Sequence, residues 1–376
     1  MIPVESRGDL TTFMKVPWSL YGDDPNWVPP LFSELSKQLR AGLNPYFEHA
    51  EARYWIARRE GVPVGRISAQ VDDLERRHHG TRTGHFGFIE AIDDGDVFAA
   101  LFAAAEGWLR DKGMTHVTGP FNLSINQESG LLVDGFDTPP KMMMGHAHPY
   151  YGPRIEALGY TKAKDLYAYD LDITHGFPAP VQRLLRRAER HGQVTLRPLN
   201  MKRYDQELAN IIDIFNDAWS DNWGFIPLTE AEARADAKAM KALVVPKMVY
   251  IAEVAGELVG MMITLPNLNE AIADLNGRLL PFGWAKLLWR LKVRHLSSGR
   301  VVMMGVRKKL QNSALSAIIA FLLIETSRRG AVAWGLQSSE LSWILEDNTG
   351  MRQMLEAINS RLYKTYRIYG KSLPPA

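Results

Sequence analysis

The feature that most constrains the fold is a repeated order of predicted elements. From Arg53 to Asp72 the chain alternates around a Gly-Val-Pro turn, which predicts a β-hairpin. A strand (84–92), a helix (96–113), a short strand (115–119), a helix (149–160) and a strand (165–173) follow. The order of the first half is therefore β-β-β-α-β-α-β.

The second half repeats this order after an additional helix over 203–219. A second hairpin spans 248–266, followed by a strand (300–306), a long helix (314–330), a strand (331–337), a helix (348–358) and a strand (363–369). Because the order of elements recurs, we predict a tandem duplication of one α/β fold with a mixed sheet. The predicted domains are 1–172 and 194–376, joined by a linker helix within 173–193.

Composition narrows the class of protein. The 376-residue chain is 46% hydrophobic and 23% charged, which is ordinary for a folded protein. It contains no cysteine, so disulfides and thiolate nucleophiles are excluded, and its first residues carry no secretion signal. We therefore expect a cytoplasmic protein. The net charge of +2 argues against a general nucleic-acid binder.

Charge is distributed unevenly along the chain. Between Asp274 and Glu325 there is no acidic residue, while nine arginines and lysines lie in that window. Such a positive field suits the phosphates of a cofactor or lipid headgroups. A solvated basic face, balanced by acids elsewhere in the fold, would give the same pattern.

Within this window, residues 278–296 form a basic, amphipathic segment. Its apolar residues recur at helical spacing from Trp284 to Leu291, and its basic residues run along another side. It is too short and too charged to span a membrane, so it either packs on the core or lies in a membrane interface. In the second case Trp284 and Trp289 would contact acyl chains. The basic stripe would then face anionic lipid, giving peripheral attachment to the inner face of the membrane.

The element order, with a helix beginning just after the central strand of each half, resembles the GNAT superfamily of acyl-CoA N-acyltransferases. The resemblance covers nearly the whole chain, once per half, and implies two tandem GNAT-like domains with acyl-CoA as co-substrate. In that family a Gln/Arg-x-x-Gly-x-Gly/Ala loop follows the central strand. Its backbone amides, at the start of a helix, bind the pyrophosphate of coenzyme A.

The matching stretch here is VRKKLQNSALSA, residues 306–317. Gln311 stands at the first motif position, and Ala314 and Ser316 replace the two glycines. A backbone amide near Val306 would stabilise the oxyanion of the reaction. By the resemblance, the residues predicted to bind acyl-CoA are Val306, Arg307, Gln311, Asn312, Ser313, Ala314, Ser316 and Asn348.

The first half lacks this motif. The loop after its central strand is DDGDV, whose three aspartates would repel a pyrophosphate, so this half is predicted to be a non-catalytic copy. Its polar loop over 119–136 is expected to line a substrate cleft between the halves. The substrate contacts predicted there are Asn122, Asn126 and Glu128.

Amide formation from a thioester requires a neutral amine and a group that takes its proton. Glu340 is the first candidate for this base, followed by Glu346 and Asp347, which also suit the capping of the next helix. The tyrosine that protonates the leaving thiolate in the resembling family would stand one residue before Glu356, where this chain has Leu355. The other candidates are Tyr363, Tyr366 and Tyr369, and spacing selects none of them.

Two histidines could suggest a metal. His146 and His148 would share one face of a strand, but no third ligand stands at a telling distance. We expect hydrogen-bonding roles for both and no metal.

Together these features predict an N-acyltransferase that moves an acyl group from acyl-CoA to an amine. The insert makes the chain resemble the bacterial ceramide synthase type of GNAT-like enzyme, which implies a long-chain lipid amine such as a sphingoid base or its keto precursor. Two alternatives stay open. One is a Fem-type aminoacyltransferase, which also has two GNAT-like halves and uses aminoacyl-tRNA; the other is a non-catalytic module that binds acyl-CoA or lipid. We expect no nucleic-acid partner.

Overall fold

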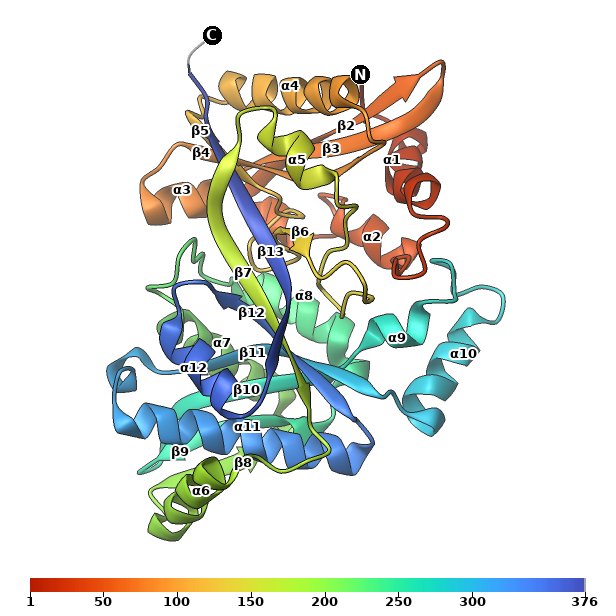
Figure 1. Ribbon diagram of the computed structural model, residues 1–376. Helices are drawn as coiled ribbons and strands as arrows, with labels where there is room; N and C mark the ends of the chain where they lie inside the picture. The colour runs from red at the N-terminus through yellow and green to blue at the C-terminus, as the bar shows by residue number, and fades with distance from the viewer. Residues whose placement is uncertain (375–376) are drawn as a thin grey trace. The chain divides into compact units, whose positions relative to one another are not determined.

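The computed structural model describes residues 1–374 (Figure 1). Contacts divide the chain into two units, and the boundaries do not follow the two sequence halves. Unit 1 comprises Met1–Leu166, Ile272–Leu279 and the chain from Lys364 onward. Unit 2 comprises Tyr167–Ala271 and Leu280–Tyr363. Strands β7 (Thr161–Asp172) and β13 (Arg361–Ser372) contribute residues to both units.

Unit 1 is a mixed sheet with helices. Its strands are β1 (Ile2–Pro3), β2 (Ala50–Arg59), β3 (Val62–Asp72), β4 (Thr83–Ala91), β5 (His116–Gly119) and β6 (Leu131–Asp134). Its helices are α1 (Arg7–Leu20), α2 (Phe32–Gln38), α3 (Asp73–His79), α4 (Gly95–Asp111) and α5 (Tyr151–Glu156). The strand order is β1-β2-β3-β4-β5-β13, with β6 also paired to β13. Strands β4 and β5 are parallel, whereas β2, β3 and β4 are antiparallel.

Unit 2 has the same plan. Its own strands are β8 (Val194–Pro198), β9 (Val249–Val254), β10 (Glu257–Pro266), β11 (Ser298–Val306) and β12 (Ser338–Leu345). Its helices are α6 (Ala179–His191), α7 (Tyr204–Ala218), α8 (Glu230–Met240), α9 (Leu268–Ile272, whose last residue counts with unit 1), α10 (Gly283–Trp289), α11 (Ala314–Trp334) and α12 (Thr349–Ala357). The strand order is β7-β12-β11-β10-β9-β8. Strands β11 and β12 are parallel, like β4 and β5 in unit 1.

In each unit the hairpin carries helices on both faces. In β3, a Cβ at Gly65 would meet Leu101 of α4, while the next residue, Arg66, donates to the Phe13 carbonyl of α1. In β10, a Cβ at Gly260 would meet Ile319 and Leu323 of α11. Met261, the next residue, packs in a cluster with Ile214 and Phe215 of α7. Because neighbouring side chains of a strand point to opposite faces, each sheet lies between an early helix and the long helix after its central strand.

The predicted strand over 331–337 is wrong. Helix α11 continues to Trp334, ends at left-handed Gly335 (φ 118°), and β12 begins only at Ser338. Ala331 belongs to the core beneath the helix, so tertiary packing overrides the strand preference of the Ala-Val-Ala-Trp stretch. The difference matters because the prediction left Glu340 in a loop, whereas the structure places it within strand β12.

Helices α1 and α2 were not predicted, and they supply much of the unit 1 core. Phe13 of α1 and Leu35 of α2 pack in one cluster with Tyr54 and Phe88. The linker helix was predicted and corresponds to α6.

Candidate active site

The central strand of unit 2 leads directly into the predicted acyl-CoA loop. Strand β11 ends at Val306, and α11 begins at Ala314. Strands β11 and β12 pair in parallel from Ser298 with Ser338 to Val301 with Leu341, and they part beyond that register. The loop and the first turn of α11 therefore follow the point where two parallel strands separate.

The start of α11 has the features of an anion site. The Ser313 side chain accepts from the Ser316 amide at 3.1 Å, and Asn312 has a left-handed backbone (φ 62°). Asn312, Ser313 and Ala314 are exposed. The Gln311 side chain points back and donates to the Val306 carbonyl at 2.9 Å, which fixes the loop against its strand. Since the other first-turn amides of a helix lack intrahelical acceptors, a pyrophosphate could take them.

The basic residues of this loop already have partners within unit 2. Arg307 forms an ion pair with Asp213, Lys308 with Asp221 at 2.6 Å, and Lys309 with Glu257. In the Lys308 and Lys309 pairs both partners are exposed, and exposed pairs contribute roughly 0–1 kcal/mol. Arg307 is less exposed, and its Nε also donates to the Leu258 carbonyl at 2.7 Å. A phosphate could therefore replace the carboxylates of the two lysines at small cost.

Glu340 is completely buried in a network of polar side chains. Its carboxylate accepts from the hydroxyls of Ser342 and Tyr363, and Nε of Arg300 lies 3.4 Å from it. The same Arg300 Nε donates to the Ser342 hydroxyl at 2.8 Å. Tyr363 is partly exposed, so its hydroxyl links the buried carboxylate to a less buried position.

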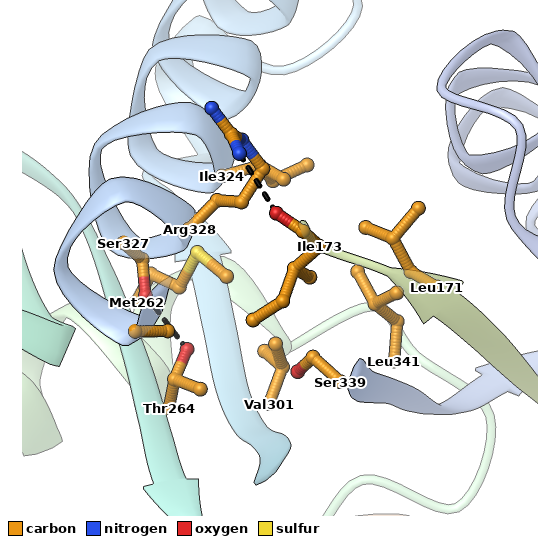
Figure 2. Close-up of a pocket in the computed structure, with 11 residues that line it drawn as sticks. Leu171, Ile173, Met262, Thr264, Val301, Ile324, Ser327, Arg328, Ser339 and Leu341 are labelled. Carbon is orange, nitrogen blue, oxygen red and sulfur yellow. Dashed lines mark hydrogen bonds between the residues drawn. The ribbon is translucent and has the colours of Figure 1, made fainter. Parts of the chain in front are cut away.

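The network and a nearby pocket lie on opposite faces of the sheet. Figure 2 shows the residues that line this pocket, which is partly open to solvent. Val301 and Leu341 line it beneath α11, and their strand neighbours Arg300 and Glu340 are paired in register. Adjacent side chains alternate, so Arg300 and Glu340 point to the other face, where α7 packs against β11.

The remaining acidic candidates surround the start of α12. Asn348 caps this helix, since its side chain accepts from the Met351 amide at 3.1 Å. The Glu346 carbonyl accepts from Arg352 at 2.9 Å, and the Asp347 carbonyl accepts from the Thr349 amide at 2.8 Å. The roles predicted for the side chains of Glu346, Asp347 and Asn348 stay predictions.

The three tyrosines of β13 have different surroundings. Tyr363 belongs to unit 2 and donates to Glu340. Tyr366 and Tyr369 belong to unit 1, where Tyr369 donates to Glu156 at 3.0 Å. Tyr363 is thus the tyrosine that the fold brings to the predicted base.

In unit 1, the helix start that corresponds to the start of α11 is capped by a carboxylate of the protein. Asp94 caps α4 and accepts from the amides of Asp96 and Val97, at 2.9 Å and 3.3 Å. Arg59 also pairs with Asp94 at 2.8 Å. The predicted repulsion of a pyrophosphate by this loop therefore has a structural basis.

The polar loop of unit 1 is largely bonded to itself. The Asn122 side chain accepts from the Phe88 amide at 2.7 Å and donates to Glu128. The Asn126 amide donates to the Ser124 hydroxyl at 3.1 Å. These residues lie in unit 1 and Glu340 in unit 2, so their role as substrate contacts stays a prediction.

The two histidines of unit 1 have hydrogen-bonding partners. His146 Nε2 lies 2.7 Å from Asp24, and burial lowers the pKa of this histidine. His148 Nε2 lies 3.1 Å from the Leu20 carbonyl, and its ring stacks on Tyr21. Across residues 1–374, no group of three or more His, Cys, Asp or Glu side chains could hold a metal ion.

Sequence reasoning missed Arg300 and Ser342. Arg300 is the one charged residue of a buried strand, β11, which was a usable signal. Ser342 gave none, because its importance depends on the register of β12 against β11.

Comparisons with known proteins bear on this site. No family model matches the chain. The chain is 50% identical to the bacterial ceramide synthase of Caulobacter vibrioides, over 99% of this chain and 97% of that protein. It is 48% identical to protein YghO of Escherichia coli, over 98% of this chain and 94% of that protein. A solved tandem GNAT protein from the clavulanic acid biosynthesis pathway matches with a TM-score of 0.59 and 14% identity, over 100% of this chain and 98% of that one.

The fold and these relationships define the class, an acyl-CoA-dependent N-acyltransferase with two tandem GNAT units. The chain belongs to the family that includes the bacterial ceramide synthase and protein YghO. The predictions of a mixed α/β fold, of tandem GNAT domains and of an acyltransferase are confirmed.

Proposed function

We propose that this protein transfers a long-chain acyl group from acyl-CoA to the amine of a lipid, such as a sphingoid base or its keto precursor. The relative named bacterial ceramide synthase supports this substrate class. The observation that carries the proposal is an exposed apolar surface in the unit that holds the acyl-CoA loop. The aminoacyl-tRNA and non-catalytic alternatives are not favoured by these relationships.

The exposed apolar surface belongs to the insert. Leu280 is 78% exposed, Phe282 77% and Val293 64%, and Trp284 and Trp289 are each 51% exposed. Another side of the insert packs on the unit 2 core through Leu287 and Leu291. The insert therefore both packs on the core and presents large apolar side chains to its surroundings. Exposed patches of this kind mark sites of lipid or protein contact.

The chemistry is assigned to the network around Glu340. In this proposal the amine attacks the thioester carbon, and the Tyr363 hydroxyl takes the amine proton while passing its own proton to Glu340. The new C–N bond forms, the C–S bond breaks, and the proton returns through Tyr363 to the thiolate. Arg300 holds the Glu340 carboxylate, which keeps the relay oriented. The products are the amide and free coenzyme A.

The other parts of the site position acyl-CoA. The pyrophosphate is assigned to the amides at the start of α11, between Asn312 and Ser316, with support from Arg307. The backbone amide near Val306 is assigned to the oxyanion of the tetrahedral intermediate.

Product analysis tests the proposed function. Purified protein is incubated with acyl-CoAs of short and long chain, and with sphinganine, 3-ketosphinganine or a polyamine as acceptor. Mass spectrometry then detects the amide and free coenzyme A. We expect turnover with long-chain donor and lipid amine. Turnover with small amines alone would overturn the lipid assignment, and acyl-CoA binding without any turnover would favour the non-catalytic module.

We also infer that the insert attaches the enzyme to the inner face of an anionic membrane. Lys292 and Arg294 are exposed beside the apolar side chains, which suits anionic headgroups. In residues 1–374, no helix is long and apolar enough to cross a membrane. Replacing Leu280, Phe282 and Trp289 by serine should reduce binding to lipid vesicles. Serine at Leu43, Val62 and Leu362, which are exposed outside the insert, should leave it unchanged.

A further inference from the structure

Helix α6 (Ala179–His191) carries two stripes of opposite character. Val181, Leu185 and Ala188 pack on the unit 2 core, and the helix contacts α11. Four arginines at i, i+3, i+4 and i+7 form the other stripe and are all exposed: Arg183, Arg186, Arg187 and Arg190. The arginine stripe is displaced by two positions from the apolar one, about 200° around a helix with 3.6 residues per turn, so it faces away from the core.

The arginine stripe has no counter-charge from the part of the chain that the structure describes. Within residues 1–374, no carboxylate lies within ion-pair distance of any of the four arginines. Arg186 donates to the neutral Gln182 side chain at 3.2 Å, and Arg190 donates to the Arg186 carbonyl at 3.3 Å. The one acidic residue of the helix, Glu189, lies 3.5 Å from Arg329 of α11.

This arrangement opposes helix formation. Like charges three and four residues apart repel along a helix, and no acidic residue occupies the first turn of α6 to complement its dipole. The chain nevertheless builds a continuous helix from Ala179 to His191. An external anionic surface would relieve the repulsion, because it would supply counter-charges that the described residues do not provide.

We propose that α6 is a docking helix for an anionic lipid bilayer. Guanidinium groups bind phosphates in a two-pronged geometry, and a row of them on one side of a helix suits a plane of headgroup phosphates. Unit 2 also exposes the aliphatic side chains of Leu280 and Val293, which suit a lipid surface and, unlike aromatic rings, cannot stack on bases. The inference does not depend on acyl transfer, so it can fail or hold independently of the catalytic assignment.

The test is co-sedimentation of the full-length protein with vesicles of phosphatidylcholine, with and without phosphatidylglycerol. The variant is R183Q/R186Q/R187Q/R190Q. Its matched control removes four exposed charges that lie elsewhere, K15Q/R77Q/K202Q/K238Q, and so has the same net charge. We expect the α6 variant to lose roughly 10²- to 10³-fold in partition onto anionic vesicles at low salt, since each basic residue near such a surface contributes severalfold. The control should lose far less, and binding to pure phosphatidylcholine should be equal for all three proteins.

Several outcomes would overturn the proposal. Equal losses of vesicle binding in the variant and the control would show that only the net charge matters. Unchanged binding of the α6 variant would show that the helix does not contact the bilayer. A loss of polyribonucleotide binding, with vesicle binding intact, would make nucleic acid the partner. If circular dichroism shows that the fourfold variant does not fold, the double variant R186Q/R187Q takes its place. It should lose about half as much partition onto anionic vesicles on a logarithmic scale. A double variant without any loss would refute the proposal.

Discussion

Replacing Tyr363 by phenylalanine tests the proposed proton relay most directly. The substitution removes one oxygen, and with it the hydrogen bond that Tyr363 donates to Glu340. Glu340 keeps the Ser342 hydroxyl and Arg300 as partners, so the buried carboxylate is not left bare. The change therefore separates a chemical role of the hydroxyl from a purely structural one.

The structural role predicts a loss of stability, whereas the chemical role predicts a loss of rate. Loss of one hydrogen bond to a buried carboxylate should lower the free energy of unfolding by about 1–3 kcal/mol. Loss of the relay should lower kcat by about 10²- to 10⁴-fold, because a positioned proton-transfer group contributes that much. Native proteins are stable by about 5–15 kcal/mol, so a loss of this size should leave most of the protein folded at 25 °C and should not cause such a fall in rate.

The assay compares Tyr363→Phe with Tyr369→Phe in initial rates of amide formation and in thermal unfolding. Tyr369 is a matched control, because it lies on the same strand and donates to Glu156 at 3.0 Å. Both variants should lose similar stability, and only Tyr363→Phe should lose activity. A rate for Tyr363→Phe close to that of the unchanged protein, or equal losses in the two variants, would refute the relay.

Three further predictions concern stability. Arg300→Met should lower the free energy of unfolding by about 3–5 kcal/mol in urea denaturation, because it leaves the carboxylate of Glu340 buried without its cation; a small loss would show that water reaches the site. Gly330→Ala should lower the free energy of unfolding by at least about 1–3 kcal/mol, despite the helix preference for alanine. The reason is that the added Cβ would lie 1.6 Å from the Lys247 carbonyl oxygen. A rise in Tm would contradict this close packing. Burial raises the pKa of Asp236 to about 7, so the folded state holds an extra proton between about pH 4 and 7 and loses stability as pH rises through that window. Asp236→Asn should therefore stabilise the protein above pH 7, by about 1–2 kcal/mol given partial exposure, and have little effect near pH 3.5; a pH-independent difference would contradict the shift.

The order of elements was predictable because it depends on local patterns. Alternation around a turn marked both hairpins, and the helical repeat marked α4, α11 and α6. The place of the loop that we predict to bind acyl-CoA was readable for a similar reason, since it is one continuous stretch between β11 and α11. Helix α1 escaped prediction because threonines and an internal proline, Pro17, weaken its local signal.

The network around Glu340 could not be predicted in the same way. Arg300, Glu340 and Tyr363 come from three strands separated by tens of residues, and their meeting depends on strand order and register. A shift of one residue in β12 would turn Glu340 to the pocket face beneath α11. The sequence offered Glu340 as an acid near the loop, but only the register makes it the partner of Tyr363.

The corresponding helix starts of the two units differ in the charge of a single capping residue. At the start of α11 the cap is Ser313, a neutral side chain that satisfies one amide and leaves the positive end of the helix to an external anion. At the start of α4 the cap is Asp94, whose carboxylate satisfies two amides and already supplies the negative charge. Arg59 then pairs with Asp94 instead of with a ligand. The duplicated helix start is thus retained in both units, while the charge of its cap directs acyl-CoA to unit 2 in the function we propose.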